Sequence, residues 1–69
     1  MWIKTIDGMY NSDYLTAIWL EDADGECRTC AQNHVGDRIV LSWHNDVRGI
    51  IKQGLINEDD YVEVIRYGR

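Results

Sequence analysis

An alternation of apolar and polar side chains along short segments is the feature that most limits how this chain can fold. In residues 38–43, Ile39, Leu41 and Trp43 face one side and the residues between them face the other, as they would in a β-strand. Four further segments have the β-branched and aromatic content of strands: 1–6, 15–20, 26–31 and 61–67. The sequence therefore predicts a domain built mainly from sheet.

Turn residues separate the first of these strands. Residues 7–8 are an Asp-Gly pair, and residues 11–13 carry side chains that bond to nearby backbone groups, which predicts a chain reversal followed by a capped turn. Asp24 and Gly25 lie between the segments 15–20 and 26–31. Because glycine readily takes the positive φ that a tight turn requires, this pair predicts a β-hairpin.

One segment changes to helical spacing. Between residues 45 and 55 apolar side chains recur three and four positions apart, with Asn45 as the predicted N-cap and an end near Gly54. The order ββββαβ predicts a single α+β domain over residues 1–69, in which one helix packs on one face of a small, curved, mostly antiparallel sheet of four or five strands. The large apolar residues of these segments form the expected core: Trp19, Ile39, Leu41, Trp43, Ile50, Ile51 and Val64.

The charged residues are unevenly distributed. Twelve acidic residues against seven basic ones give a net charge of −5, which argues against binding to DNA or RNA because such binding needs a basic surface. Most of the acids fall in two clusters: Glu21, Asp22, Asp24 and Glu26, and Glu58, Asp59, Asp60 and Glu63. Clustered carboxylates attract basic protein surfaces, and Tyr61 and Tyr67 near the second cluster can supply anchoring contacts. These residues predict a partner-binding surface for a protein with a basic face.

Two other binding hypotheses follow from different residues. Arg28, Arg38 and Arg48 could converge on a phosphate, with Tyr10, Tyr14 or His34 beside them, as in an oligomeric protein that sequesters a nucleotide; three solvated arginines are the simpler interpretation. Cys27 and Cys30, with His34 and His44, could complete a zinc site. Positions i and i+3 of a strand face opposite sides, however, so we expect reduced thiols, with Cys27 buried and Cys30 near the edge, and no cofactor.

Enzymatic activity is not expected. Ser12 and Ser42 lie outside any Gly-x-Ser-x-Gly motif, and the glycines do not cluster into a phosphate-binding loop. The chain has neither a signal-peptide pattern nor a long apolar run, which predicts a cytoplasmic location and no membrane contact. Since a core of this size rarely contributes more than about 3–5 kcal/mol, we also expect a homo-oligomer.

The opening Met-Trp-Ile-Lys-Thr-x-Asp-Gly, residues 1–8, resembles the start of many short uncharacterised proteins of Gram-positive bacteria and their phages. The resemblance covers about the first third of the chain. It implies a phage or mobile-element accessory protein, a class whose members often block host proteins, defence proteins included, or sequester signalling nucleotides. The resemblance assigns no functional residue. Taken with the acidic clusters, it predicts a non-catalytic inhibitor of a host protein.

Overall fold

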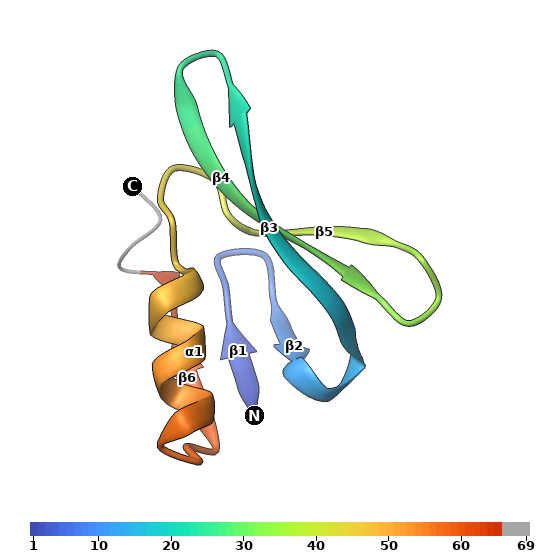
Figure 1. The fold of residues 1–69 in the computed structure, drawn as a ribbon, viewed down its shortest axis with the longest axis vertical. Coiled ribbons are helices and arrows are strands. Elements are labelled where there is room, and N and C mark those ends of the chain that lie inside the picture. The colour runs from blue at the N-terminus through green and yellow to red at the C-terminus, as the bar shows by residue number, and fades with distance from the viewer. Residues whose placement is uncertain (66–69) are drawn as a thin grey trace.

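The computed structural model describes residues 1–65, with the side chain of Ala23 left out. Figure 1 shows strands, one short 3₁₀ helix and one α-helix, in this order along the described chain: β1 (Trp2–Lys4), β2 (Met9–Asn11), η1 (Ser12–Tyr14), β3 (Leu15–Ala23), β4 (Glu26–Asn33), β5 (Arg38–Ser42), α1 (Arg48–Ile56) and β6 (Tyr61–Glu63). The predicted α+β class is confirmed. Between residues 1 and 65, no helix has both the length and the apolar character needed to span a membrane.

The strands form two sheets where a single sheet was expected. One three-stranded sheet, here called sheet A, has the order β2-β1-β6, and the other, sheet B, has the order β3-β4-β5. All pairings are antiparallel except that of β1 with β6. The sequence analysis missed β2, because three residues are too few to show an alternation. The 3₁₀ turn η1 follows β2 directly, with the Asn11 side chain accepting from the Asp13 backbone N–H, and leads the chain from sheet A into sheet B.

The hairpin predicted between β3 and β4 is confirmed. Asp24 and Gly25 both take positive φ, 54° and 79°, and they connect the paired strand ends Ala23 and Glu26. Two consecutive residues with positive φ give a turn whose twist matches that of the flanking strands. The hairpin reaches the top of the view in Figure 1, at the opposite end of the molecule from the turn between α1 and β6.

The core lies where both sheets and the helix meet. A single cluster of buried side chains draws on every layer: Ile3, Ala31, Leu41, Val47, Ile51 and Val64. The predictions for Leu41, Ile51 and Val64 are confirmed, and Ile39 and Ile50 pack against the cluster while partly buried. Ile3, Ala31 and Val47 were not among the expected core residues.

Two of the tryptophans depart from the expected core. Trp43 is 39% exposed; its indole N–H donates to Asp7 Oδ2 at 3.2 Å, and the Arg28 guanidinium lies 5.0 Å from its ring centre. Trp19 is half-buried and donates to Glu21 Oε2 at 2.9 Å. An indole N–H needs an acceptor, and these two tryptophans find one in a carboxylate. The prediction that Trp43 is a core residue was wrong, and Trp19 stays outside the buried cluster.

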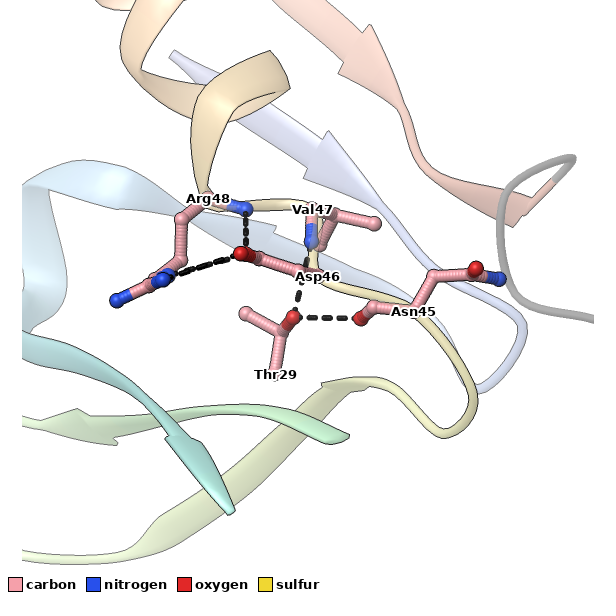
Figure 2. A network of polar contacts seen from close by, with 5 residues as sticks. All are labelled: Thr29, Asn45, Asp46, Val47 and Arg48. Atoms are coloured by element: carbon pink, nitrogen blue, oxygen red, sulfur yellow. Dashed lines mark hydrogen bonds and ion pairs between the residues drawn. The ribbon is translucent and has the colours of Figure 1, made fainter. Parts of the chain in front are cut away.

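The start of α1 is stabilised by a side chain of β4 and not by the predicted N-cap. The helix begins at Arg48, after Val47, which has no side-chain cap. Figure 2 shows what replaces it: the Thr29 hydroxyl, from β4, accepts from the Val47 backbone N–H at 3.0 Å and donates to the Asn45 carbonyl at 2.7 Å. The Asp46 carboxylate accepts from the backbone N–H of Arg48 at 3.1 Å and also from its guanidinium. The prediction of Asn45 as N-cap was wrong because a long-range contact took over that role.

Gly54 lies inside α1 and does not mark its end. A glycine is needed at this position because there is no room for a side chain. A Cβ at this position would lie 2.7 Å from Met1 Sδ and 2.7 Å from Val62 Cγ1, whereas at Gly49 of the same helix it would meet no described atom within 4 Å. We expect Gly54→Ala to lower the free energy of unfolding by about 1 kcal/mol, since overpacking costs about 1–3 kcal/mol and helix propensity returns about 1.

The matched change Gly49→Ala is expected to raise the free energy of unfolding by about 0.5–1 kcal/mol, because it gains helix propensity without a clash. Urea denaturation of the two variants beside the parent measures both effects. If Gly54→Ala also stabilised the protein, the close packing of α1 on Met1 and Val62 would be contradicted.

Candidate functional site

Two exposed aromatic side chains lie side by side on the outer face of sheet A. Trp2 of β1 and Tyr61 of β6 are register partners, and partners in neighbouring strands share a face of the sheet. The next pair, Ile3 and Val62, points to the other face, where Ile3 is fully buried. Trp2 is 46% and Tyr61 47% exposed. The inner face of sheet A therefore packs into the core, and its outer face presents a tryptophan and a tyrosine to solvent.

An acidic turn adjoins this aromatic pair. Glu58, Asp59 and Asp60 are all exposed and directly precede Tyr61, and the Trp2 backbone N–H donates to the Asp60 carbonyl at 2.8 Å. The backbone contact ties the turn to β1 as well as to β6. The backbone of the acidic turn is thus held next to the aromatic pair by the sheet itself.

The acidic turn has an unfavourable local sequence. The backbone N–H groups of Glu58 and Asp59 bond to the carbonyls of Leu55 and Gly54 at 3.1 and 2.9 Å, which is the Schellman arrangement that ends many helices. Its left-handed position normally holds glycine, yet here Glu58 has φ 58°. Acidic residues at the C-terminal end of a helix also oppose the helix dipole. Local stability therefore does not explain why carboxylates occupy this turn.

The structure keeps the two predicted acidic clusters apart. The first one lies along the β3–β4 hairpin, at the other end of the molecule in Figure 1. Arg38 and Trp19 donate to Glu21 and lower its carboxyl pKa to about 2, and His44 contacts Glu26. Two of its four carboxylates, then, have partners in the fold, whereas Asp22 and Asp24 are exposed. The second cluster is the better placed for a partner; its Glu63 is half-buried, and Tyr67 lies outside the described residues.

The three arginines of the alternative ligand site do not converge. Arg28 lies over the Trp43 ring, Arg38 bonds to Glu21 through two guanidinium nitrogens, and Arg48 bonds to Asp46 at 3.0 Å. Arg38 and Arg48 each form an ion pair with a neighbouring carboxylate. No phosphate-binding group formed by the three is present in the described structure.

Tyr10 and His34, by contrast, line the same pocket, which is formed by residues of both sheets. The pocket has a volume of about 430 Å³ and is lined mostly by apolar and aromatic side chains of β1, β2, η1, β3 and β5, with polar groups from the end of β4 and the following loop. Tyr14 also lines it, and its ring centre lies 5.4 Å from that of His34. These three residues were considered from the sequence only as possible neighbours of the arginines; the structure places them together in a pocket that Arg28, Arg38 and Arg48 do not line.

The cysteine and histidine residues do not form a metal site. Within residues 1–65, no group of three or more His, Cys, Asp and Glu side chains is arranged to hold a metal ion. Cys30 is fully buried and Cys27 half-buried, the reverse of the prediction, because Cys30 pairs with Trp19 in the middle of sheet B while Cys27 lies near the hairpin. Burial raises the pKa of the Cys30 thiol. The zinc hypothesis gains no support.

Trp2 is the site residue that the sequence analysis missed. It was treated only as part of a strand, although its position next to the buried Ile3 in an alternating segment already required one of the two to face outwards. Its partnership with Tyr61 could not be predicted, because the two residues lie at opposite ends of the chain and meet through a parallel pairing.

Comparison of the chain with protein-family models, with curated proteins and with solved structures gives no match.

Proposed function

We propose that this chain is a non-catalytic protein-binding module that docks through Trp2, Tyr61 and the acidic turn, residues 58–60, onto a basic surface of a host protein and inhibits it by covering that surface. The observation that carries the proposal is the register pairing of two half-exposed aromatic side chains beside three exposed carboxylates. The resemblance of residues 1–8 to phage and Gram-positive proteins supports a host protein as the partner, in the cytoplasm.

The arrangement has the two properties that a specific interface needs. Tryptophan and tyrosine are the residues that most often dominate binding energy, because each buries a large rigid area. Carboxylates around them steer a basic partner and reject acidic ones. The net charge of −5 adds to this attraction at long range.

The unfavourable sequence of the acidic turn also supports the proposal. Departures from local sequence preference tend to occur at functional sites, where another requirement outweighs stability. Here the residue at the left-handed position is Glu58 and not glycine. A requirement for negative charge beside Trp2 and Tyr61 accounts for this choice.

Site-specific photo-crosslinking tests the proposal. A photoreactive phenylalanine analogue placed at Tyr61 and expressed in the native host is expected to capture a protein with a basic surface, identified by mass spectrometry. The same analogue at Asp22, which is exposed in the β3–β4 hairpin at the other end of the molecule in Figure 1, is the matched control and is expected to capture none of it. Capture of the same protein from both positions, or of a second copy of this chain from position 61, contradicts the proposal.

The purified partner then provides a quantitative test. We expect the double variant Asp59→Asn and Asp60→Asn to weaken binding by about 5- to 20-fold at low salt, less so at high salt, because the interaction is largely electrostatic. The matched control Asp22→Asn with Asp24→Asn carries the same charge change at the other end of the molecule. Equal losses for the two double variants would show that net charge and not this face determines binding.

Self-association remains a prediction. Sheets A and B end in the edge strands β2, β6, β3 and β5, and exposed strand edges can pair between subunits. Sedimentation equilibrium across a range of concentrations measures the subunit number, and a monomer at every concentration would contradict the prediction.

A further inference from the structure

We infer that this pocket, which is lined by residues of both sheets, receives a cationic side chain, arginine or lysine, from the basic partner. The inference rests on the proposed function for the identity of the occupant. Trp2 lines this pocket and also belongs to the aromatic pair on the outer face of sheet A. The pocket and the proposed docking face are therefore continuous, and a partner seated on one reaches the other.

The lining suits a cation with an apolar stem. Trp2, Tyr10 and Tyr14 supply aromatic rings, and Met9, Leu15 and Ile39 supply aliphatic surface. Aromatic faces attract ammonium and guanidinium groups, while apolar walls accommodate the methylene chain that carries them. A volume of about 430 Å³ is ample for one such side chain.

The polar end of the pocket carries a negative charge. Asp37 is its one carboxylate among the described lining residues, and no described lysine or arginine lines it. The Asn33 side chain fixes the loop that bears Asp37: its amide oxygen accepts from the backbone N–H groups of Val35 and Asp37 at 3.1 and 2.8 Å, and its amide nitrogen donates to the Asp37 carboxylate at 3.3 Å. The carboxylate is thus held in place before a ligand arrives.

The same lining disfavours a nucleotide. Phosphate groups would meet Asp37 and find no described cation within the pocket, because Arg28, Arg38 and Arg48 lie elsewhere. An uncharged apolar side chain would fill the walls but leave the Asp37 carboxylate without a counter-charge. An arginine or lysine side chain matches both the apolar walls and the negatively charged Asp37 end of the pocket.

Titration of the full chain with blocked amino acids tests the inference without the partner. The probes are Nα-acetyl-arginine methylamide, the lysine analogue, and the norleucine analogue as the uncharged control of similar length. Chemical shifts of the Trp2 indole and of Tyr14 report binding in ¹H–¹⁵N and aromatic NMR spectra. The two cations are expected to bind at least about 5-fold more tightly than norleucine.

Three variants test whether Tyr14 and Asp37 bind the cationic probes. Tyr14 is 58% exposed, so its replacement is not expected to disturb the core. Tyr14→Ala and Asp37→Asn are each expected to weaken arginine binding by about 3- to 10-fold, whereas Tyr14→Phe keeps the aromatic ring and is expected to stay within about 2-fold of the parent. Well-dispersed spectra of each variant confirm that it is folded.

The remaining outcomes overturn the inference. These are no binding by any probe, norleucine binding as tightly as arginine, adenosine monophosphate binding more tightly than arginine at the same residues, or arginine binding unchanged in Tyr14→Ala and Asp37→Asn. A cation-selective pocket without a crosslinked partner would overturn the proposed function alone. A partner whose affinity falls in the acidic-turn variant but not in Tyr14→Ala or Asp37→Asn would overturn the pocket's role alone.

Discussion

Leu41→Ala is expected to lower the free energy of unfolding by about 2–5 kcal/mol. Leu41 is 2% exposed and belongs to the cluster in which side chains of both sheets and α1 meet. Its removal opens a cavity bordered by three layers, none of which can move inwards without losing contacts with the others. Since stability of about 0.05–0.15 kcal/mol per residue is usual, this loss is a large part of the total for 69 residues.

Leu55→Ala is the matched control. It deletes the same atoms from a leucine that is 49% exposed on α1, where alanine is also a good helix former, and it is expected to cost less than about 1 kcal/mol. Guanidinium chloride denaturation followed by tryptophan fluorescence measures both variants. Equal losses would mean that the shared core is not the main source of stability, and Leu41→Val provides a milder change if Leu41→Ala does not fold.

Thr29→Val is expected to lower the free energy of unfolding by about 2–4 kcal/mol. Two effects combine: the buried Val47 backbone N–H loses its acceptor, and the Asn45 carbonyl loses its donor. The substitution keeps the volume and the β-branched shape of the side chain, so it removes only the hydroxyl. That hydroxyl accepts from the Val47 backbone N–H and donates to the Asn45 carbonyl. Because Val47 is fully buried, water cannot replace the lost acceptor.

Ser42 provides a control for buried hydroxyls in the same place. It is the register partner of Thr29 and is 2% exposed, but its hydroxyl has no hydrogen-bond partner among the described residues. Ser42→Ala is therefore expected to change the free energy of unfolding by no more than about 0.5 kcal/mol, or to raise it. Thr29→Ser, which keeps the hydroxyl, is expected to lose less than Thr29→Val. Thermal denaturation of Thr29→Val, Thr29→Ser and Ser42→Ala measures these differences. Similar melting temperatures for Thr29→Val and Ser42→Ala would contradict the role of the Thr29 hydroxyl.

Local sequence signals predicted the elements of this fold better than their assembly. The strand at residues 38–42 and the Asp24-Gly25 turn depend on neighbouring residues only, and both were predicted correctly, although Trp43 was not a core residue. The start of α1 was misplaced because Thr29, at a sequence distance of 18 residues from Val47, replaces the predicted cap. Sheet A depends on the pairing of β1 with β6, and no nearby residue encodes a partner that distant.

The candidate site shows the same limit. Composition identified the acidic turn and Tyr61, since charge clusters are visible in the sequence without a structure. Trp2 could not be assigned to that site, because the partner that places it there is at the far end of the chain. Arg38 belonged to the alternative ligand site, yet it bonds to Glu21, and this contact depends on the order of three strands.

The parallel pairing of β1 with β6 also determines when Trp2 and Tyr61 can meet during synthesis. β1 leaves the ribosome first, but its parallel neighbour at residues 61–63 is among the last segments to be made. Closing so long a loop carries an entropic cost and slows folding. The three strands of sheet B are consecutive in the chain, whereas Trp2 and Tyr61 can become neighbours only after residue 61 has been made. A chain truncated before residue 61 would therefore lack the pairing that brings these two aromatic side chains together.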